Sequence, residues 1–299
     1  MLDKKKLYEW CCIPAEKLLD HPDRRIELRI LPDAKALGEL MALDFAEDIE
    51  KANKEGRKYH AIVPCGPKDW YGPFARIINQ RRISLKNVVC FHMDENLDWQ
   101  GRLLHEKDPN NFRTFMHEFF YEAIDPGLQV PTENRHYLLP ETYMEIARRI
   151  GETDIDYCLG GWGQDGHLAF NLARRNHYSP ITLEEMRNST ARIQDNNPDT
   201  VLALSQRGLG TAWQFMPPMS ITLGVKECLK AKKVRVYSAT GAWKQTALRV
   251  ALFSEPTADF PITLLQEHPD AIMSATEETA RHPFAENPHW RFNGVNDEV

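Results

Sequence analysis

The chain alternates short runs of apolar, often β-branched residues with longer stretches in which apolar residues recur at helical spacing. Continuous or alternating apolar runs predict buried strands, whereas apolar residues three or four positions apart predict helices that pack by one face. The runs that predict strands cover residues 25–31, 59–65, 87–93, 155–161, 233–239 and 261–265.

Helical spacing is clearest between Asp33 and Lys54, and similar apolar stripes cover residues 110–124 and 242–253. Strands that alternate with helices predict an α/β fold: a doubly wound, mostly parallel sheet with helices on both faces, Rossmann-like in its layers. No repeat or Pro/Ser-rich linker interrupts the pattern. We therefore expect one domain over residues 1–299, with an irregular tail from about residue 280, where Pro and Asn are frequent.

The composition indicates an ordinary globular protein. The chain has 299 residues, 42% of them hydrophobic and 27% charged, with a formal net charge of −6, which argues against a nucleic-acid-binding surface. The charged start lacks the apolar core of a signal peptide, and no stretch approaches the roughly 18 apolar residues that cross a bilayer. We expect a cytoplasmic protein with neither a nucleic-acid nor a membrane partner.

The six cysteines form no C-x-x-C pair and no zinc-ribbon spacing, so we expect reduced, mostly buried thiols. The histidines are spread too far apart in sequence to suggest a ligand set, and we expect no metal. Cys65 remains a site candidate because it ends a predicted strand.

Ligands of open parallel sheets bind outside the carboxyl ends of the strands. Polar or glycine-rich segments follow four of the predicted strands, at residues 66–73, 94–96, 162–167 and 240–244. We expect these segments to meet at one cleft.

Asp94 and Glu95 follow a strand that should be buried, where a carboxylate is costly unless it is paired, hydrogen-bonded or open to a wet cleft. One of the two is expected to face a ligand. The alternative is that they cap the next segment, as acidic residues often do at strand ends.

The stretch CLGGWGQDGHLAFN, residues 158–171, contains four glycines and places Asp165 and His167 around one of them. Such a cluster marks a turn where the main chain approaches another group closely. Histidine is the natural proton shuttle near neutral pH, which makes His167 a candidate acid/base. The alternative is a histidine that only bonds to nearby backbone.

Five stretches carry a family resemblance: FHMDEN at 91–96, DPNNFRTFMHEFF at 108–120, the glycine-rich stretch, PPMSITLGVKECLKAKKV at 217–234 and TGAWKQTAL at 240–248. In order and spacing the chain resembles the glucosamine-6-phosphate deaminase/isomerase family from residue 60 to residue 250. The related 6-phosphogluconolactonases share the D-G-H turn, but MDEN and HLAFN are more similar to the deaminase branch.

The resemblance implies that Asp94 moves a proton between C2 and C1 of the opened sugar. It also implies that His167 opens the pyranose ring and that Asp165 orients His167. Enolisation fits this assignment, because one carboxylate on one face of the C1–C2 bond must remove and return the proton. Lys244 matches the family's phosphate-binding lysine, at the start of a predicted helix. The implied partner is a sugar or sugar phosphate, without a cofactor, and homo-oligomerisation is plausible from the family.

The chain departs from the family pattern at three places. Leu172 stands where the family has a glutamate that completes an Asp-His-Glu group. The phosphate loop, T-G-G-T in the family, retains only Gly66, and Pro67 lacks an amide hydrogen, which Lys68 would offset by charge. Arg207 is displaced by one position from the expected phosphate-binding arginine. Substrate binding is assigned to Cys65, Gly66, Lys68, Glu95, Gly163, Arg207 and Lys244.

The main hypothesis is therefore an enzyme that isomerises an aldose to a ketose, with or without deamination, on a sugar phosphate or related acidic sugar through an enediol-type intermediate. One alternative is a sugar-binding sensor without catalysis, against which the chain shows no helix-turn-helix or other output module. Another is a lactone hydrolase in which His167 activates water. Analysis of the products separates the three.

Overall fold

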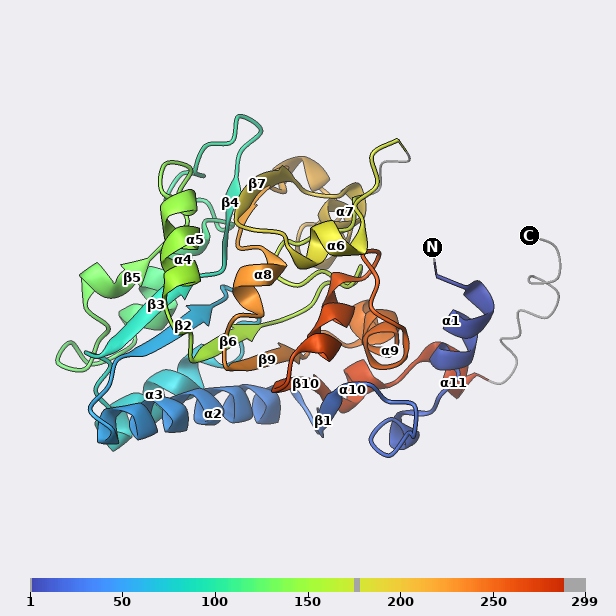
Figure 1. The fold of residues 1–299 in the computed structure, drawn as a ribbon, viewed down its shortest axis with the longest axis horizontal. Helices are drawn as coiled ribbons and strands as arrows, with labels where there is room; N and C mark the ends of the chain where they lie inside the picture. The colour runs from blue at the N-terminus through green and yellow to red at the C-terminus, as the bar shows by residue number, and fades with distance from the viewer. Residues whose placement is uncertain (1, 175–177, 288–299) are drawn as a thin grey trace.

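The computed structural model describes residues 2–174 and 178–287. Its centre is a seven-stranded sheet in the order β1-β10-β9-β6-β2-β3-β5, in which all neighbours run parallel (Figure 1). The strands are β1 (Glu27–Leu31), β2 (Tyr59–Val63), β3 (Val88–His92), β5 (Arg135–His136), β6 (Tyr157–Gly160), β9 (Lys233–Ser238) and β10 (Ala271–Thr276).

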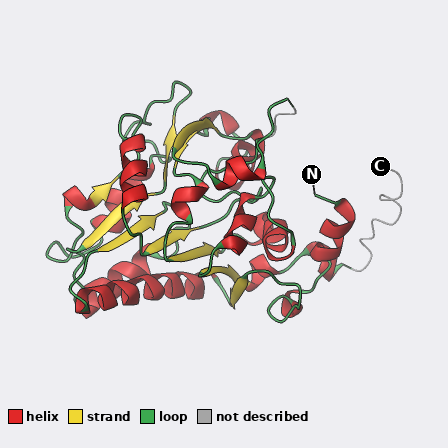
Figure 2. Ribbon diagram, in the orientation of Figure 1, coloured by secondary structure: helices red, strands yellow, loops and turns green. Residues whose placement is uncertain are grey.

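Helices cover both faces of this sheet (Figure 2). Along β2, Ile62 contributes to one apolar cluster while Ala61 and Val63 contribute to the other, as the two-residue period of a strand requires. The predicted doubly wound α/β fold is confirmed. One face is covered mainly by α2 (Ala34–Lys54) and α3 (Tyr71–Arg81), and the other by α5 (Tyr143–Glu152), α8 (Val225–Cys228) and α9 (Gln245–Phe253).

The remaining helical elements lie on both sides of β6 in the sequence. Those before β6 are α1 (Lys4–Cys11), η1 (Ala15–Lys17), α4 (Phe112–Met116), η2 (His117–Tyr121) and η3 (Thr132–Asn134). Those after β6 are α6 (Leu183–Arg187), α7 (Pro198–Gly208), η4 (Trp213–Phe215), η5 (Gly241–Lys244), η6 (Pro261–Glu267), α10 (Glu277–Ala280) and α11 (Pro283–Glu286). None of the helices within the described ranges is long and apolar enough to cross a membrane.

Five of the six predicted strands are confirmed, and the sixth is wrong. Residues 261–265 begin the 3-10 helix η6, because Pro261 starts a helical turn well and a short apolar run has no diagnostic period. Two strands of the large sheet were not predicted. One is β5, which has only two residues, and the other is β10, whose sequence AIMSAT is fully buried but mixes small polar and apolar residues. Its burial on both faces removed the alternation by which strands are found.

A second, three-stranded antiparallel sheet was not expected. It has the order β4-β8-β7, with β4 at Asp94–Leu97, β8 at Met219–Thr222 and β7 at Arg192–Asp195. Asp94 is therefore the first residue of a strand rather than part of a loop.

The predicted helix at 33–54 is confirmed as α2, with Asp33 accepting a hydrogen bond from the amide of Ala36 as its N-cap. The stripe at 110–124 forms α4 followed by the π-helical turn η2, and 242–253 forms most of η5 and α9. The expected irregular tail contains the short helix α11, and its residues 288–299 lie outside the described chain. Five of the six cysteines are buried, and all six are free thiols.

The chain reverses its direction across the sheet between β2 and β6. From β2 it continues through β3 to β5 on one side, whereas β6, β9 and β10 lead back to β1 on the other. Open α/β sheets bind ligands at such a switch point, outside the carboxyl ends of the strands. The segments after β2 and β6 are therefore the place to look for a site.

Candidate active site

The loops that follow β2 and β6 touch each other. A Cβ atom added to Gly161 would lie 3.4 Å from Cδ of Pro67 and 3.2 Å from the carbonyl oxygen of Tyr237. The absence of a side chain at Gly161 thus lets the Cys65–Pro67 loop approach the glycine-rich turn. Two of the segments expected to meet at the switch point do so.

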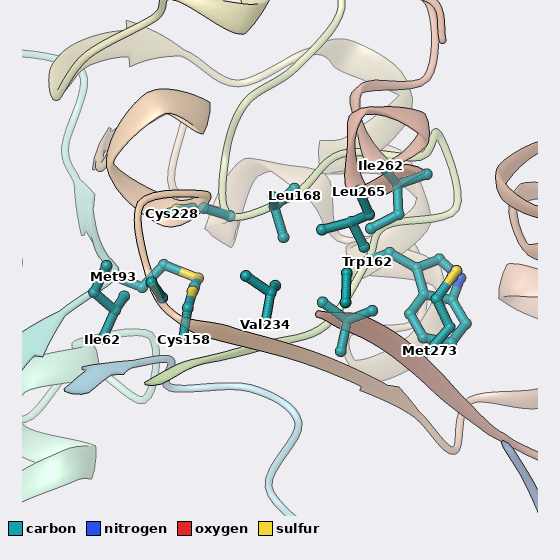
Figure 3. Close-up of a cluster of buried hydrophobic side chains, with 14 of the residues drawn as sticks. Ile62, Met93, Cys158, Trp162, Leu168, Cys228, Val234, Ile262, Leu265 and Met273 are labelled. Atoms are coloured by element: carbon teal, nitrogen blue, oxygen red, sulfur yellow. The ribbon is translucent and has the colours of Figure 1, made fainter. Parts of the chain in front are cut away.

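The glycine-rich turn is anchored at both ends in the core. Trp162 and Leu168 pair across the turn, and both side chains are buried in the same apolar cluster as Val234 and Met273 (Figure 3). Within the turn, the amide of Gly163 donates to the carbonyl of His167 at 3.0 Å. The turn therefore presents residues 163–167 from a rigid base.

Gly163 is required by the imidazole of His167. A Cβ atom at this position would lie 2.2 Å from Cε1 and 2.3 Å from Nδ1 of that ring, well inside van der Waals contact. The ring lies directly against the backbone. We propose that Gly163, assigned to substrate binding from the sequence, positions His167 instead.

Asp165 and His167 form a close pair. Nδ1 of His167 lies 2.7 Å from Oδ1 of Asp165, whose side chain is 2% exposed, while that of His167 is 16% exposed. Burial would raise the pKa of Asp165, but the charge and hydrogen bonds of His167 outweigh it and lower the pKa to about 2. The carboxylate stays ionised and lies against Nδ1, so we assign proton exchange to the other ring nitrogen, Nε2.

The second oxygen of Asp165 has a partner that the sequence did not indicate. Oγ1 of Thr200, on α7, donates a hydrogen bond to Oδ2 of Asp165 at 3.2 Å. Thr200 is 1% exposed, so this contact is shielded from water.

Asp94 lies on the backbone segment that adjoins the glycine-rich turn. Asp94 pairs with Thr222 across the small sheet, and Oγ1 of Thr222 accepts a hydrogen bond from the amide of Phe170 at 3.1 Å. The ring centroid of Phe170 lies 5.8 Å from that of His167. A continuous set of contacts thus connects the residue that carries the carboxylate to the imidazole.

The surroundings of Asp94 disfavour its ionised form. Burial, and next the negative charge of Glu95, raise its pKa to about 8. Asp94 keeps partial exposure, and its carboxylate accepts no hydrogen bond from the residues that the structure describes. Such a carboxyl group exchanges protons near neutral pH.

Glu95 is occupied by the main chain. Its carboxylate accepts hydrogen bonds from the amides of Asn96 at 2.8 Å, Phe112 at 2.8 Å and Arg113 at 2.7 Å. Burial raises its pKa to about 7 in spite of these bonds. The capping alternative describes Glu95 well, and we propose that it holds α4 against β4 rather than contacting substrate.

The loop after β2 contributes a neutral thiol and an exposed cation. Burial raises the pKa of Cys65 far above its usual range, with Lys68 opposing this effect, so the thiol is not a ready nucleophile. Nζ of Lys68 lies 3.7 Å from the ring centroid of Phe115, a cation–π contact. Gly66 faces open space, with no atom within 4 Å of an added Cβ.

Arg207 and Lys244 form the cationic side of the site. The guanidinium of Arg207 lies 5.8 Å from the ring centroid of Trp243, and Nζ of Lys244 lies 5.8 Å from that of Trp162. Burial, and next the charge of Arg207, lower the pKa of Lys244 to about 7, while Asp165 opposes them. Neither cation has an ion pair with an acidic side chain in the described ranges, so both are available to an anion.

Leu172 is 6% exposed and offers no acid near His167. The preceding Asn171 fixes the end of the turn: its Nδ2 donates to the carbonyls of Leu168 and Leu223, and its Oδ1 accepts from Arg192. As the sequence indicated, the site therefore has one carboxylate on the imidazole, that of Asp165. Within residues 2–174 and 178–287, no three His, Cys, Asp or Glu side chains gather as a metal site.

Known proteins resemble the chain over most of its length. The glucosamine-6-phosphate deaminase of Yersinia enterocolitica is 30% identical over 231 residues, which cover 72% of this chain and 76% of that relative. The glucosamine-6-phosphate deaminase of Phocaeicola vulgatus is 30% identical over 255 residues, covering 82% and 89%. No protein-family model matches the chain.

Solved structures share the fold of this chain. A monomeric glucosamine-6-phosphate deaminase superposes with a TM-score of 0.71 at 20% identity, covering 85% of this chain and 99% of that one. A 6-phosphogluconolactonase from Shewanella baltica OS155 superposes with a TM-score of 0.59 at 17% identity, covering 84% and 97%. These likenesses establish the fold that carries the site.

Proposed function

Because the chain belongs to the glucosamine-6-phosphate deaminase family, we propose that it converts glucosamine 6-phosphate and water into a 2-ketose 6-phosphate and ammonia. The observation that carries this proposal is the pair of proton-transfer groups at the switch point. Asp94 and the Asp165–His167 pair lie on adjoining segments joined through Thr222 and Phe170.

The first step assigned to the site is opening of the pyranose ring. His167 takes the proton of the C1 hydroxyl on Nε2 and delivers a proton to the ring oxygen as the C1–O bond breaks. The imidazole becomes transiently cationic, and Asp165, which stays ionised, stabilises that charge. The product is the open aldehyde with its amine on C2.

The second step is proton transfer between C2 and C1. Ionised Asp94 removes the proton from C2 and returns it to C1 on the same face, while one proton of the amine passes to the C1 oxygen. The aldehyde and amine thereby become an alcohol at C1 and an imine at C2. Water then adds to C2 and ammonia leaves, giving the ketose. A carboxyl group whose pKa is about 8 is well matched to both halves of this transfer.

The phosphate is assigned to the cationic side. Arg207 and Lys244 come from α7 and η5, and both lack acidic partners within the described ranges. Lys68 and the open backbone at Gly66 lie across the switch point from them. Charge-assisted hydrogen bonds from these cations would fix the far end of the sugar and orient C1 and C2.

The proposal is tested by identifying products. We expect purified protein incubated with glucosamine 6-phosphate to release ammonia and ketose phosphate in equal amounts. Ketose phosphate without ammonia would restrict the activity to isomerisation. Release of free acid from 6-phosphogluconolactone, without reaction of the amino sugar, would replace the proposal with lactone hydrolysis. Binding of the amino sugar without turnover would indicate a sensor rather than an enzyme.

The raised pKa of Asp94 predicts a pH dependence. Only the ionised carboxylate accepts the C2 proton, and this form predominates above about pH 8 in the free chain. We therefore expect the protonation of Asp94 to cause the acidic limb of the kcat/KM profile, since kcat/KM reports groups of the free enzyme. In Glu95→Gln the acidic limb of the kcat/KM profile should move to lower pH, because the negative charge that raises the pKa of Asp94 is gone.

Glu95→Gln suits this test because glutamine keeps an oxygen in place of Oε1, which accepts the amides of Asn96 and Phe112. Glu106→Gln, an exposed position on the loop after β4, is the control and should leave the limb unchanged. If the acidic limb moves equally in both variants, or in neither, then a group other than Asp94 causes that limb.

A further inference from the structure

One buried hydroxyl at the site has no role in the steps above. Thr200 is the third residue of α7, and its Oγ1 donates to Oδ2 of Asp165 at 3.2 Å. Oδ1 of the same carboxylate lies 2.7 Å from Nδ1 of His167. The three side chains thus form a line from α7 through the carboxylate to the imidazole.

The contact between Thr200 and Asp165 is buried. Thr200 is 1% exposed although α7 is largely a surface helix, with Leu202 and the residues from 206 onward exposed. A buried carboxylate that lost one of its hydrogen-bond donors would hold the imidazole in a less defined orientation. Thr200 also comes from a different segment than Leu172, the position at which the family pattern has a glutamate.

Thr200 also lies on the same side of α7 as Arg207. Seven residues separate the two, which is close to two turns of an α-helix. The helix that presents a guanidinium to the cationic side therefore also contacts the acid/base pair.

We propose that Thr200 is a positioning residue of the reaction: it fixes the Asp165 carboxylate, and through it the orientation of His167, from the helix that carries Arg207. The inference rests on the proposed function for its catalytic consequence. The contact itself does not depend on which sugar is bound.

The direct test is Thr200→Val, which keeps the shape of the side chain and removes its donor. We expect kcat for glucosamine 6-phosphate to fall about 10-fold, the lower end of the effect of one lost hydrogen bond to a charged group, while KM changes little. Thr200→Ser restores the donor and should recover most of the loss. A merely structural role would affect both variants alike, or neither.

Ser205→Ala is the matched control on the same helix. Ser205 is buried like Thr200, but its hydroxyl donates to the carbonyl of Leu202 and does not contact Asp165. We expect Ser205→Ala to leave kcat unchanged. A loss equal to that of Thr200→Val would assign the effect to the packing of α7 and overturn the proposal.

A second readout works without turnover. In protein labelled with ¹⁵N-histidine, nuclear magnetic resonance reports the protonation and surroundings of Nδ1 of His167. We expect Thr200→Val to shift or broaden this signal and Thr200→Ser to restore it. An unchanged signal in Thr200→Val would overturn the proposal even if the wild-type chain does not act on glucosamine 6-phosphate, an outcome that would defeat only the proposed function.

Discussion

Replacing Asp94 with Asn is expected to lower kcat by about 10²–10⁴-fold, the usual contribution of a general base, while KM for glucosamine 6-phosphate changes little. Asparagine has nearly the same shape but cannot accept the C2 proton. Steady-state kinetics should be paired with exchange of the C2 proton into heavy water, which reports the step assigned to Asp94 directly.

Asp94→Asn should also be at least as stable as the wild-type chain above neutral pH. The pKa of the Asp94 carboxyl is about 3.9 in the unfolded chain and is raised to about 8 in the folded chain. The folded chain therefore loses stability as the pH rises from the first value through the second. The amide removes that cost, so urea denaturation at alkaline pH should show no loss of stability. Loss of activity together with loss of stability would contradict the assigned role.

Asp98→Asn is the control for a carboxylate nearby in the chain. Asp98 follows β4, and its side chain pairs with Arg102 outside the chain of contacts that leads to His167. This variant should keep most of the wild-type kcat. If Asp94→Asn retains as much activity as Asp98→Asn, the base is another group.

Replacing Lys244 with Met is expected to raise KM for glucosamine 6-phosphate about 10–100-fold, because a hydrogen bond to a charged group contributes about 1.5–3 kcal/mol. Methionine keeps an apolar side chain of similar length near Trp162 and lacks the ammonium group. The rate with unphosphorylated glucosamine, which lacks the anion, should be the same in Lys244→Met as in the wild-type chain.

The same variant should alter the alkaline side of the pH profile. Burial and the charge of Arg207 lower the pKa of Lys244 to about 7, so in the free chain the ammonium form is lost as the pH rises through this value. The wild-type kcat/KM should therefore pass through a maximum between the values for Lys244 and Asp94. In Lys244→Met the alkaline decline should disappear.

Lys226→Met, at an exposed lysine on α8, is the control for a general change of charge and should leave KM and the profile unchanged. An unchanged KM in Lys244→Met would place the phosphate elsewhere, with Lys68 the next candidate. Retention of the alkaline decline would show that another group causes it.

The sequence predicted the layers of the fold because strands and helices have different apolar periods. Five strands of the large sheet and helix α2 follow from this signal alone. It failed for β10, where burial on both faces removes alternation, and for residues 261–265, where five residues are too few to show a period. The small antiparallel sheet was missed because its strands have only four residues each.

The candidate site was predictable where residues lie close in sequence. Asp165, His167 and the glycines between β6 and Leu168 share one turn, and their pattern predicts it. The contact of Thr200 with Asp165 joins positions 35 residues apart, and nothing in the local sequence around Pro198 indicates it. The roles of Glu95 and Gly163 likewise depended on neighbours that only the folded chain brings together.

The close approach of the His167 ring to Gly163 has a consequence for evolution and design. An imidazole that rests on bare backbone has lost its rotational freedom before any ligand arrives, so that entropy is spent during folding rather than during each catalytic cycle. Every side chain larger than hydrogen at position 163 would collide with the ring. Laboratory libraries that aim to widen the range of accepted sugars should therefore hold this codon constant and vary the residues around the phosphate instead.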